Sequence, residues 1–470
     1  MTKTIKADLC VIGAGSGGLS VAAGAAQLGR KVVLIEKGEM GGDCLNTGCI
    51  PSKALIAAAA RAQTMRTASK FGVANVEPAI DFNAVMDHVE GVIAAISPID
   101  SQERFEGLGV TVLREQASFT DPRQLRAGPY IVNARHFIIA TGSTPFVPPI
   151  KGVADTPYLT NETIFKNRTL PDHLIIIGGG PIGVEMAQAH RRLGARATII
   201  EGATILNKDD PDLVTVIRDQ LVEEGIDIIE NAMVESVAND HGRINVAAGG
   251  KTVQGSHLLM AVGRTPTVDG LNLEAASVYY DKKGIKVDKR LRTSNKRIYA
   301  IGDVIGGRQF THVAGYHASL IIRNILFKIP SANHDYQAPW VTYADPELAH
   351  VGLTQAEARE KHSGVRIVRW GFDENDRAQA ERDTTGFVKI AVAKGGKILG
   401  ASIVGRGAGD LIQPWALAIS NGLKIKAFTS YIAPYPTRGE ANKRAGGAWY
   451  TPTLFSARTR RLVSLLSIFD

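Results

Sequence analysis

The sequence predicts an α/β protein with parallel, doubly wound sheets. The order strand, glycine turn, helix, strand occurs twice along the chain, and each copy has the spacing G-x-G-x-x-G between its first strand and its helix. The expected elements are strand 7–13, a helix ending at residue 27 and strand 31–36 in the first copy, and strand 174–177, helix 184–193 and strand 197–201 in the second. Two copies predict two nucleotide-binding domains.

A third domain of a different kind is expected in the last part of the chain. At roughly 150 residues per domain, a chain of 470 residues predicts about three domains. Residues 336–470 contain no glycine fingerprint, but they hold a strand-like run at 386–393 and a helical pattern at 410–422. This composition predicts a mixed α+β domain.

Charge and hydropathy exclude two classes of partner. The net charge is +8, but the basic residues are scattered among acidic ones, which indicates a solvated surface and no nucleic-acid binding. Residues 9–29 carry no charge and are long enough to span a bilayer, yet the glycines at 13, 15, 17 and 18 interrupt them. A strand, a turn and a helix explain this stretch better, so we expect no integral membrane segment and no targeting signal.

The first glycine motif comprises Gly13, Gly15 and Gly18. Glycines at these positions permit a tight turn and let the backbone approach a pyrophosphate, which the following helix N-terminus attracts. The expected second strand ends at Glu36, 23 positions after Gly13. An acid placed there can bind ribose hydroxyls. The alternative, an ordinary glycine turn, is weakened because the same interval occurs again later in the chain.

The second glycine motif comprises Gly178, Gly180 and Gly183, and Glu201 lies 23 positions after its first glycine. A carboxylate at this position hydrogen-bonds a free 2′-hydroxyl and repels a 2′-phosphate. Residues 202–207 contain no arginine that could hold such a phosphate. The motif therefore predicts NADH as the cofactor, with NADPH as the alternative.

The chain has three cysteines, Cys10, Cys44 and Cys49. They are too few for the disulfide framework of a secreted protein, so a reducing, cytoplasmic setting is expected. A distorted helical turn would bring Cys44 and Cys49 close enough to form a disulfide. No further ligands lie nearby, so no metal site is predicted. The two cysteines could be a buried, unreactive pair or a pair that cycles between dithiol and disulfide. The glycine-rich segment that precedes them favours the redox-active pair. Cys10, within the first strand, is expected in the core.

Residues 41–53, GGDCLNTGCIPSK, resemble the redox-active segment of the class I pyridine nucleotide-disulfide oxidoreductases, which include dihydrolipoamide dehydrogenase, glutathione reductase and mercuric reductase. Further segments resemble motifs of this family at residues 140–142, 262–266, 298–303 and 341–353. The resemblance implies two Rossmann-like domains: an FAD-binding domain at 1–150 that is completed by 271–335, and an NAD(P)-binding domain at 151–270. A dimerisation domain at 336–470 implies a homodimer.

The resemblance also implies roles for individual residues. NADH would reduce FAD, and FAD would reduce the cysteine pair, with Cys49 as the charge-transfer thiol and Cys44 as the thiol that meets substrate. Lys53 and Glu185 match the family's ion pair near flavin N5, where a cation favours negative charge on the reduced flavin. The implied cofactor-binding residues are Gly13, Gly15, Gly18, Glu36, Lys53, Thr141, Gly142, Gly178, Gly180, Gly183, Glu201, Gly263, Arg264, Gly302 and Asp303.

One position departs from the pattern of the thiol–disulfide members. Tyr435 stands where those enzymes carry a histidine acid–base, while Glu440 keeps the position of the accompanying acid. A tyrosine with a pKa near ~10 is only about a thousandth ionised at pH 7. General acid–base catalysis contributes ~10²–10⁴-fold, so ordinary dithiol turnover should be weak. His312 and His317 are distant candidates for the base, but both are expected to be structural.

Three functional hypotheses remain open. The first is a disulfide reductase resembling dihydrolipoamide dehydrogenase, acting on a small disulfide or thiol. The second is a reductase of thiol-bound metal ions of the mercuric type, which fits Tyr435 but lacks that family's C-terminal cysteine pair. The third is a flavoprotein subunit that docks on a larger complex or a membrane, favoured only by the basic, apolar residues 456–470. Arg438, Lys443 and Arg444 could select an acidic substrate, although a solvated surface is the favoured interpretation.

Overall fold

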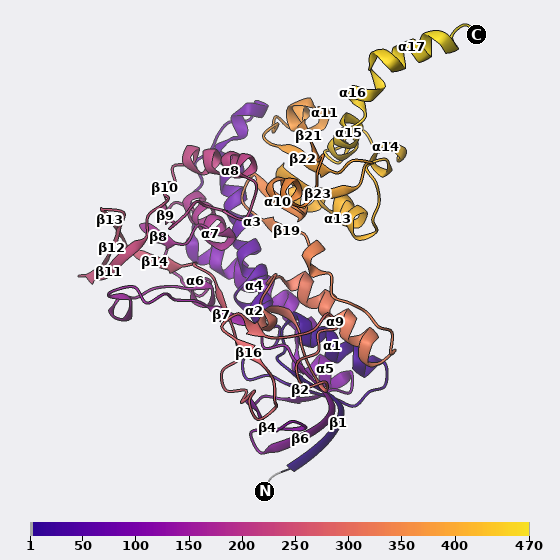
Figure 1. Ribbon diagram of the computed structural model, residues 1–470. Helices are drawn as coiled ribbons and strands as arrows, with labels where there is room; N and C mark the ends of the chain where they lie inside the picture. The colour runs from indigo at the N-terminus through magenta and orange to yellow at the C-terminus, as the bar shows by residue number, and fades with distance from the viewer. Residues whose placement is uncertain (1–2, 470) are drawn as a thin grey trace. The chain divides into compact units, whose positions relative to one another are not determined.

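The computed structural model describes residues 3–469 of the chain (Figure 1). Its contacts divide these residues into two compact units. Unit 1 contains the chain up to Thr67, Asn75–Gly202 and Asn231–Asp335, and unit 2 contains Ala68–Ala74, Ala203–Glu230 and the chain from Tyr336 onward. Asp470, the last residue of the basic, apolar segment, lies outside the described residues.

The main sheet of unit 1 has the strand order β3-β2-β1-β6-β5-β4, with β18 paired to β6. Its strands are β1 (Lys3–Ile12), β2 (Val32–Ile35), β3 (Thr111–Leu113), β4 (Ala117–Asp121), β5 (Gln124–Ala127), β6 (Tyr130–Ile139) and β18 (Ile298–Ala300). The pairs β1–β2, β1–β6, β2–β3 and β6–β18 are parallel. The predicted doubly wound class is confirmed, and β1 begins four residues earlier than the sequence pattern indicated.

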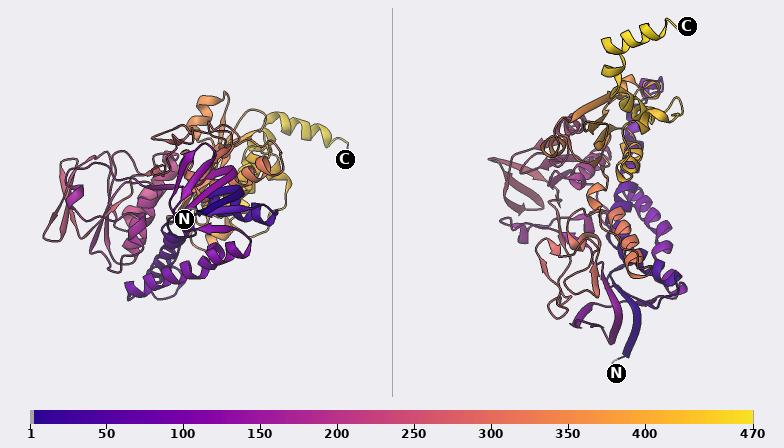
Figure 2. Two further views of the ribbon diagram at one scale, coloured as in Figure 1. Left: turned by 90° about the horizontal axis from the view of Figure 1, so that it is seen from below. Right: turned by 45° about the vertical axis from the view of Figure 1, so that its right-hand side comes forward.

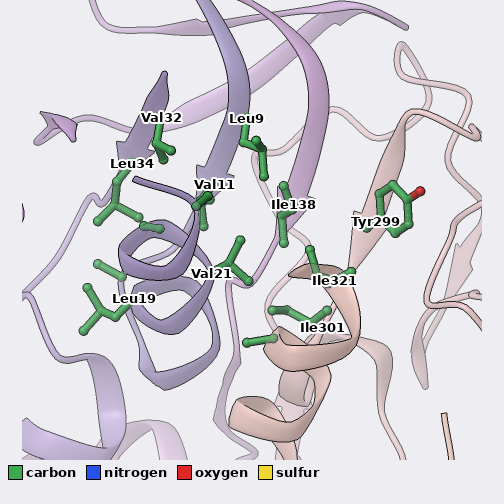
Figure 3. Packing of buried hydrophobic residues seen from close by; sticks show 14 of the residues in the cluster. Leu9, Val11, Leu19, Val21, Val32, Leu34, Ile138, Tyr299, Ile301 and Ile321 are labelled. Carbon is green, nitrogen blue, oxygen red and sulfur yellow. The ribbon is translucent and has the colours of Figure 1, made fainter. Parts of the chain in front are cut away.

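Both faces of this sheet are buried, as its apolar strands require. Successive residues of β1 alternate between two hydrophobic clusters: Leu9 and Val11 belong to one, Cys10 and Ile12 to the other. On the first face, helices α1 (Ser16–Gln27) and α9 (Thr311–Ile325) cover the strands, and Figure 3 shows their side chains, such as Val21 and Ile321, beside Val11 and Ile138 of the sheet. Cys10 is fully buried, in the core position that the sequence predicted.

A second parallel arrangement in unit 1 comprises β8 (His173–Ile177), β9 (Arg196–Ile200) and β14 (His257–Met260), with helix α7 (Pro181–Arg192) between β8 and β9. An antiparallel sheet follows, formed by β11 (Val234–Asp240), β12 (Arg243–Ala248) and β13 (Lys251–Gly255). Smaller pairs join β7 (Ser143–Pro145) to β15 (Arg264–Pro266) and β16 (Tyr280–Asp281) to β17 (Gly284–Ile285). The other helices of the unit are α2 (Gly42–Asn46), α3 (Cys49–Arg66), α4 (Phe82–Asp100), α5 (Gln102–Gly107) and α6 (Asn161–Ile164).

The two glycine turns have the same geometry. Gly13 and Gly178 adopt φ values of +103° and +111°, which side-chain-bearing residues rarely tolerate. A Cβ on Gly18 or Gly183 would collide with the carbonyl oxygen of Gly13 or Gly178, so each helix can pack against its strand only with glycine there. The sequence repeat therefore produces two superposable strand–turn–helix structures.

Unit 2 is built on an antiparallel sheet with the order β19-β20-β23-β22-β21. Its strands are β19 (Trp340–Thr342), β20 (Glu347–Gly352), β21 (Arg366–Gly371), β22 (Phe387–Val392) and β23 (Ile398–Gly405). The helices are α8 (Pro211–Glu223), α10 (Gln355–Lys361), α11 (Asp376–Ala380), α12 (Ala408–Leu411), α13 (Gln413–Ser420), α14 (Ala427–Ser430), α15 (Glu440–Ala448), α16 (Thr451–Leu454) and α17 (Ala457–Leu466). The buried core of the unit centres on Trp415, Phe372 and Ile403.

One expected helix of unit 2 is divided. The sequence pattern predicted a single helix at 410–422, whereas the structure has α12 and α13 with Ile412 between them. Pro414 lies in the first turn of α13, where its missing N–H costs no hydrogen bond, and inside a continuous helix it would have removed one. Among the helices of residues 3–469, none is both long and apolar enough to cross a bilayer.

Candidate active site

The cysteine pair lies at a break between two helices of unit 1. Cys44 is in the short helix α2, Cys49 is the first residue of α3, and Thr47 and Gly48 separate them. A Cβ on Gly48 would stand 2.9 Å from the carbonyl oxygen of Asp43, so only glycine allows the chain to turn this tightly. Both are free cysteines with no disulfide between them, and their side chains share a hydrogen bond. The break therefore supplies the distortion that a disulfide between them requires.

The pKa values of the two cysteine thiols are shifted in opposite directions. The hydrogen bond from Cys44, the Thr311 hydroxyl and the Lys53 ammonium together lower the pKa of Cys49 to about 6, against the opposing effect of burial. Thr311 Oγ1 lies 3.3 Å from Cys49 Sγ. The same hydrogen bond to Cys49, together with burial, raises the pKa of Cys44. Near neutral pH the pair therefore holds a thiolate at Cys49 and a thiol at Cys44.

An ion pair joins α3 to α7 beside the cysteines. Lys53 Nζ lies 2.9 Å from Glu185 Oε2, and the carboxylate side chain is nearly buried while the lysine is about one-third exposed. Lys53 Nζ also lies 3.3 Å from Ser52 Oγ. The carboxylate thus fixes the ammonium near Cys49, where the lysine lowers the pKa of the thiol. Two residues that are 132 positions apart in sequence are brought together here.

A hydrogen-bonded chain runs from the cysteine helix to Asp303. Asp43 Oδ1 accepts from Thr47 Oγ1 (2.7 Å) and from Asn161 Nδ2 (2.8 Å). Asp43 Oδ2 lies 3.5 Å from Arg264 Nη2. The chain continues through Ser143, as the next contacts show.

Arg264 Nε donates to Ser143 Oγ (2.7 Å), and Ser143 Oγ donates to Asp303 Oδ2 (2.7 Å). Burial raises the pKa of Asp303, and the Ser143 hydroxyl and Arg264 oppose that shift. Arg264 thus stands between two carboxylates, Asp43 on the cysteine helix and Asp303 on the segment that follows β18. Sequence reasoning identified Arg264 and Asp303 but missed what links them.

Four contributors were not predicted: Asp43, Asn161, Ser143 and Thr311. Asp43 could have been found, because it directly precedes the first cysteine of the pair and a carboxylate there must affect both thiols. Asn161 and Ser143 offer no signal in the sequence, since their contacts span more than a hundred positions. Thr311 lies 262 positions from the cysteine it touches, and the sequence gives no signal of that contact.

Each acid at the end of a second strand caps its own glycine turn. Glu36 Oε2 accepts from the backbone N–H of Ala14 at 2.6 Å, and Glu201 Oε2 accepts from that of Gly179 at 2.7 Å. Both carboxylates therefore lie at the edge of the turn, where a ribose bound along the helix N-terminus would place its hydroxyls.

The middle glycines show that these turns fit a dinucleotide. Gly15 and Gly180 have ordinary negative φ values, and a Cβ on either would meet no protein atom closer than 4.0 Å. Neither the fold nor the backbone conformation requires glycine there. Close approach of a ligand to the backbone does require it, which is the function of the middle glycine in pyrophosphate binding.

The remaining residues that the resemblance implied for cofactor binding lie at turns of unit 1. Thr141 Oγ1 donates to the carbonyl oxygen of Thr267 at 2.6 Å, and Thr267 N–H donates to the carbonyl oxygen of Gly142. Gly142, Gly263 and Gly302 all have positive φ values, of 68°, 127° and 70°. These glycines let the chain reverse direction next to Arg264 and Asp303.

His317 is buried, and it contacts one backbone N–H and one carboxylate. The backbone N–H of Gly302 donates to His317 Nδ1 at 3.2 Å, and His317 Nε2 lies 3.4 Å from Asp335 Oδ2. Because Nδ1 accepts, the ring proton is on Nε2, facing the carboxylate. His317 therefore cannot serve as the missing base. His312 is exposed and stacks on the ring of Phe310 at the start of α9.

The tyrosine segment lies in unit 2. Tyr435 Oη donates to Asp376 Oδ2 at 2.8 Å, and this hydrogen bond to a carboxylate raises the pKa of the tyrosine. Glu440 is instead paired with Arg444, at 2.8 Å. The carboxylate that accepts the hydrogen bond from the Tyr435 hydroxyl is thus Asp376 and not Glu440. Sequence reasoning did not identify Asp376. Tyr435 is a neutral hydrogen-bond donor whose side chain is largely exposed.

The interpretation of Arg438 as a solvated surface residue was wrong. Its side chain is only 11% exposed; its Nε lies 2.8 Å from Glu381 Oε2, and its Nη2 lies 3.4 Å from Asp383 Oδ2. The guanidinium also packs near the ring of Phe372. A buried, doubly paired arginine holds the tyrosine segment to α11 and is not available to select a substrate.

Comparison with known proteins gives the same assignment for nearly the whole chain. A family model for the pyridine nucleotide-disulphide oxidoreductases matches residues 7–318, and one for the dimerisation domain of that family matches residues 338–445. Mercuric reductase of Streptomyces lividans is 36% identical over 93% of this chain and 95% of its own. Dihydrolipoyl dehydrogenase of Staphylococcus aureus is 35% identical over 94% and 96%.

Solved structures of similar proteins support the same family assignment. The Cu(II) complex of the HOCl-induced flavoprotein disulfide reductase RclA of Escherichia coli superposes with a TM-score of 0.84 at 29% identity, covering 93% of this chain and 98% of that one. LpdA of Mycobacterium tuberculosis gives 0.86 at 26% identity, covering 93% and 99%. The predicted resemblance, fold class and cofactors, FAD and NAD(P)H, are confirmed. The chain belongs to the pyridine nucleotide-disulfide oxidoreductase family and is a flavin-dependent NAD(P)H:disulfide oxidoreductase.

Proposed function

We propose that this enzyme uses NADH to reduce a thiophilic metal ion that is held by thiolate sulfur, with Cys44 and Cys49 as the redox pair. The observation that carries the proposal is the contact between Tyr435 and Asp376, which keeps the tyrosine neutral. An enzyme that oxidises or forms a dithiol needs a base to move the thiol protons. A tyrosine whose pKa is raised above its usual value of ~10 cannot be that base at neutral pH.

A soft metal ion removes this requirement. Cys49 already exists as a thiolate near neutral pH, so it can bind a soft cation without a base. Binding of the ion then lowers the proton affinity of Cys44, whose proton leaves to water. Tyr435 would contribute a hydrogen bond to a ligand of the ion. Reduction of a divalent ion by two electrons consumes one NADH. The proposal also agrees with the relatives of this chain, because mercuric reductases from two different genera match most of its length.

The residues of unit 1 would divide the work as follows. FAD, when bound, would supply the redox chemistry that links the nicotinamide to the cysteine pair. Cys49 would be the sulfur nearer the flavin, and Cys44 the sulfur that meets the substrate. Lys53, held by Glu185, places a cation near the flavin and the Cys49 thiolate. Arg264 and Asp303 anchor the flavin, and the middle glycines Gly15 and Gly180 admit the two pyrophosphates.

The remaining cofactor assignments are also proposals. Gly13 and Gly18 would complete the FAD turn, with Glu36 on the ribose, and Gly178 and Gly183 the NADH turn, with Glu201 on the 2′-hydroxyl. Thr141, Gly142, Gly263 and Gly302 would shape the FAD site. We propose the domain division 1–150 with 271–335, 151–270, and 336–470.

We further propose a homodimer. Residues 338–445 match the family's dimerisation domain. In such a dimer, Tyr435 of one subunit would approach the Cys44 of the other, which gives Tyr435 and Glu440 a place at the substrate.

Three cysteines, one of them in the core, suit a reducing cytoplasmic setting.

The deciding experiment is steady-state oxidation of NADH by the purified, FAD-loaded dimer with two acceptors, mercuric ion supplied as a thiolate complex and lipoamide. We expect turnover with the metal complex to exceed that with lipoamide at least about tenfold. The Cys44→Ser variant is the control for direct reduction by released flavin and should lose metal turnover. Fast lipoamide turnover with slow metal turnover would contradict the proposal.

A small disulfide is the second candidate substrate. It is favoured by the identity of 35% to dihydrolipoyl dehydrogenase. Cys44 would have to lose its proton to attack such a disulfide, because the thiolate is the nucleophile in disulfide exchange. In this case another acid–base group must act in place of Tyr435. Lipoamide turnover that persists in Tyr435→Phe would establish this candidate.

A further inference from the structure

The segment from Ser456 to Phe469 has properties that neither the fold nor the family accounts for. It contains helix α17, whose start is capped by Ser456 Oγ accepting from the backbone N–H of Thr459 at 3.2 Å. The helix buries none of its residues. Figures 1 and 2 show it extending away from the body of unit 2. The match to the family's dimerisation domain ends at residue 445, before this segment begins.

Helix α17 has two unlike faces. At 100° per residue, Leu462, Leu465 and Leu466 lie on one side, and Phe469 continues that side beyond the last turn. Leu462 is 57% and Phe469 81% exposed. Burying such side chains would be favourable, and nothing within residues 3–469 buries them.

The rest of the helix is polar and basic. Arg460 lies opposite the leucines together with Ser464 and Ser467, Arg461 borders the apolar side, and Arg458 lies at the N-terminal end of that side, where its long side chain can reach outward. No aspartate or glutamate occurs between residues 441 and 469. A helix with leucines along one face, arginines opposite, beside and at the end of that face, and no acidic residue has the composition of helices that lie in the plane of a membrane interface.

We propose that helix α17 docks on an anionic lipid surface, with its leucines at the acyl boundary and its arginines on the lipid phosphates. The charge of the helix favours this occupant. An uncharged apolar protein surface would leave three arginines without counter-charges, whereas a lipid surface satisfies both faces at once. The docking is independent of the redox site, because α17 contributes none of the residues assigned to it.

The test is co-sedimentation of the full-length, FAD-loaded enzyme with vesicles of phosphatidylcholine alone and with vesicles containing 30% phosphatidylglycerol. We expect binding to the anionic vesicles only, weakened by raising the salt concentration. The paired variants are Arg460→Gln/Arg461→Gln and Leu462→Ser/Leu466→Ser. The arginine variant removes charge that attracts anionic lipid, and the leucine variant removes apolar surface, so each should weaken binding at least about tenfold.

Matched controls lie elsewhere in unit 2. Arg406→Gln and Leu417→Ser replace an exposed arginine and an exposed leucine outside α17 and should leave binding unchanged. NADH oxidation should be the same in all variants, which shows that they are folded. Absence of binding to anionic vesicles would overturn the proposal. So would a change of oligomeric state in the leucine variant without any vesicle binding, which would assign the apolar face to a second copy of the chain.

Discussion

Unit 1 surrounds its reactive sulfur with groups that favour a negative charge, whereas unit 2 surrounds its tyrosine with a group that prevents one. Around Cys49, the Cys44 thiol, the Thr311 hydroxyl and the Lys53 ammonium all lower the pKa. Around Tyr435, the Asp376 carboxylate raises it. This difference shows that the negative charge of the site lies on the Cys49 sulfur while Tyr435 stays protonated. The electron acceptor of the enzyme must therefore react with a thiolate without help from a tyrosine base.

The largest expected effect comes from removing the thiolate. In Cys49→Ser, the long-wavelength thiolate–flavin absorption band of the two-electron-reduced enzyme should disappear, because serine does not ionise at neutral pH. The measurement is an anaerobic titration with NADH. Cys10→Ser is the control, since Cys10 is fully buried in the core and far from ionising. Survival of the band in Cys49→Ser would assign the charge to another sulfur.

Restoring a base to unit 2 should have the next largest effect. Tyr435→His introduces a group with a pKa near ~6.5, and general acid–base catalysis then contributes up to ~10²–10⁴-fold. We therefore expect lipoamide-dependent NADH oxidation to rise by at least about tenfold. Tyr431→His, at a neighbouring tyrosine of the same segment, is the control. An unchanged rate would mean that the missing base is not what limits dithiol turnover.

Cofactor choice tests the second glycine motif. Glu201→Arg replaces a carboxylate at the edge of the turn with a cation and should shift the ratio of kcat/KM values from NADH towards NADPH by at least about tenfold, because the repulsion of a 2′-phosphate becomes attraction. Glu223→Arg, near the end of α8, controls for net charge. Unchanged cofactor preference would remove Glu201 from the nucleotide site.

Flavin retention tests the buried histidine. His317→Leu removes the acceptor of the Gly302 N–H and leaves that donor buried, which costs about 1–3 kcal/mol and should loosen the segment that carries Asp303. We expect FAD dissociation, followed by the rise of flavin fluorescence, to become several-fold faster. His317→Asn, which can still accept a hydrogen bond, should partly restore retention. The exposed His241→Leu is the control, and equal dissociation rates in His317→Leu and the parent enzyme would disprove the positioning role.

The smallest effect concerns the charge of Asp43. Its carboxylate raises the pKa of Cys49, so Asp43→Asn should lower that pKa by a fraction of a unit below about 6. Alkylation of the reduced enzyme by iodoacetamide should rise as the pH increases through the pKa, and the midpoint should move to lower pH in the variant. Glu39→Gln, an exposed acid five positions before Cys44, is the control. A midpoint moved to higher pH would show that the hydrogen bonds of Asp43 outweigh its charge.

The agreement between pattern and structure is closest where the signal is local. Gly13 and Gly178 could be predicted because each turn is formed by neighbouring residues with a positive φ and a helix packed directly on its strand. The predicted helix at 410–422 was wrong in one respect, since Pro414 divides it, and this too could have been read from the sequence. Such features depend on bonds between residues a few positions apart.

The sequence by itself determined the two nucleotide-binding turns, the reactive cysteine pair and the family, because local spacing governs these features. Only the tertiary structure decided which groups surround the cysteines and which carboxylate Tyr435 contacts. Thr311, Asn161 and Asp376 reach their partners across 262, 118 and 59 positions of the chain. The physical reason is that proton affinity depends on charges and hydrogen bonds within a few ångströms, and chain folding decides which residues come that close.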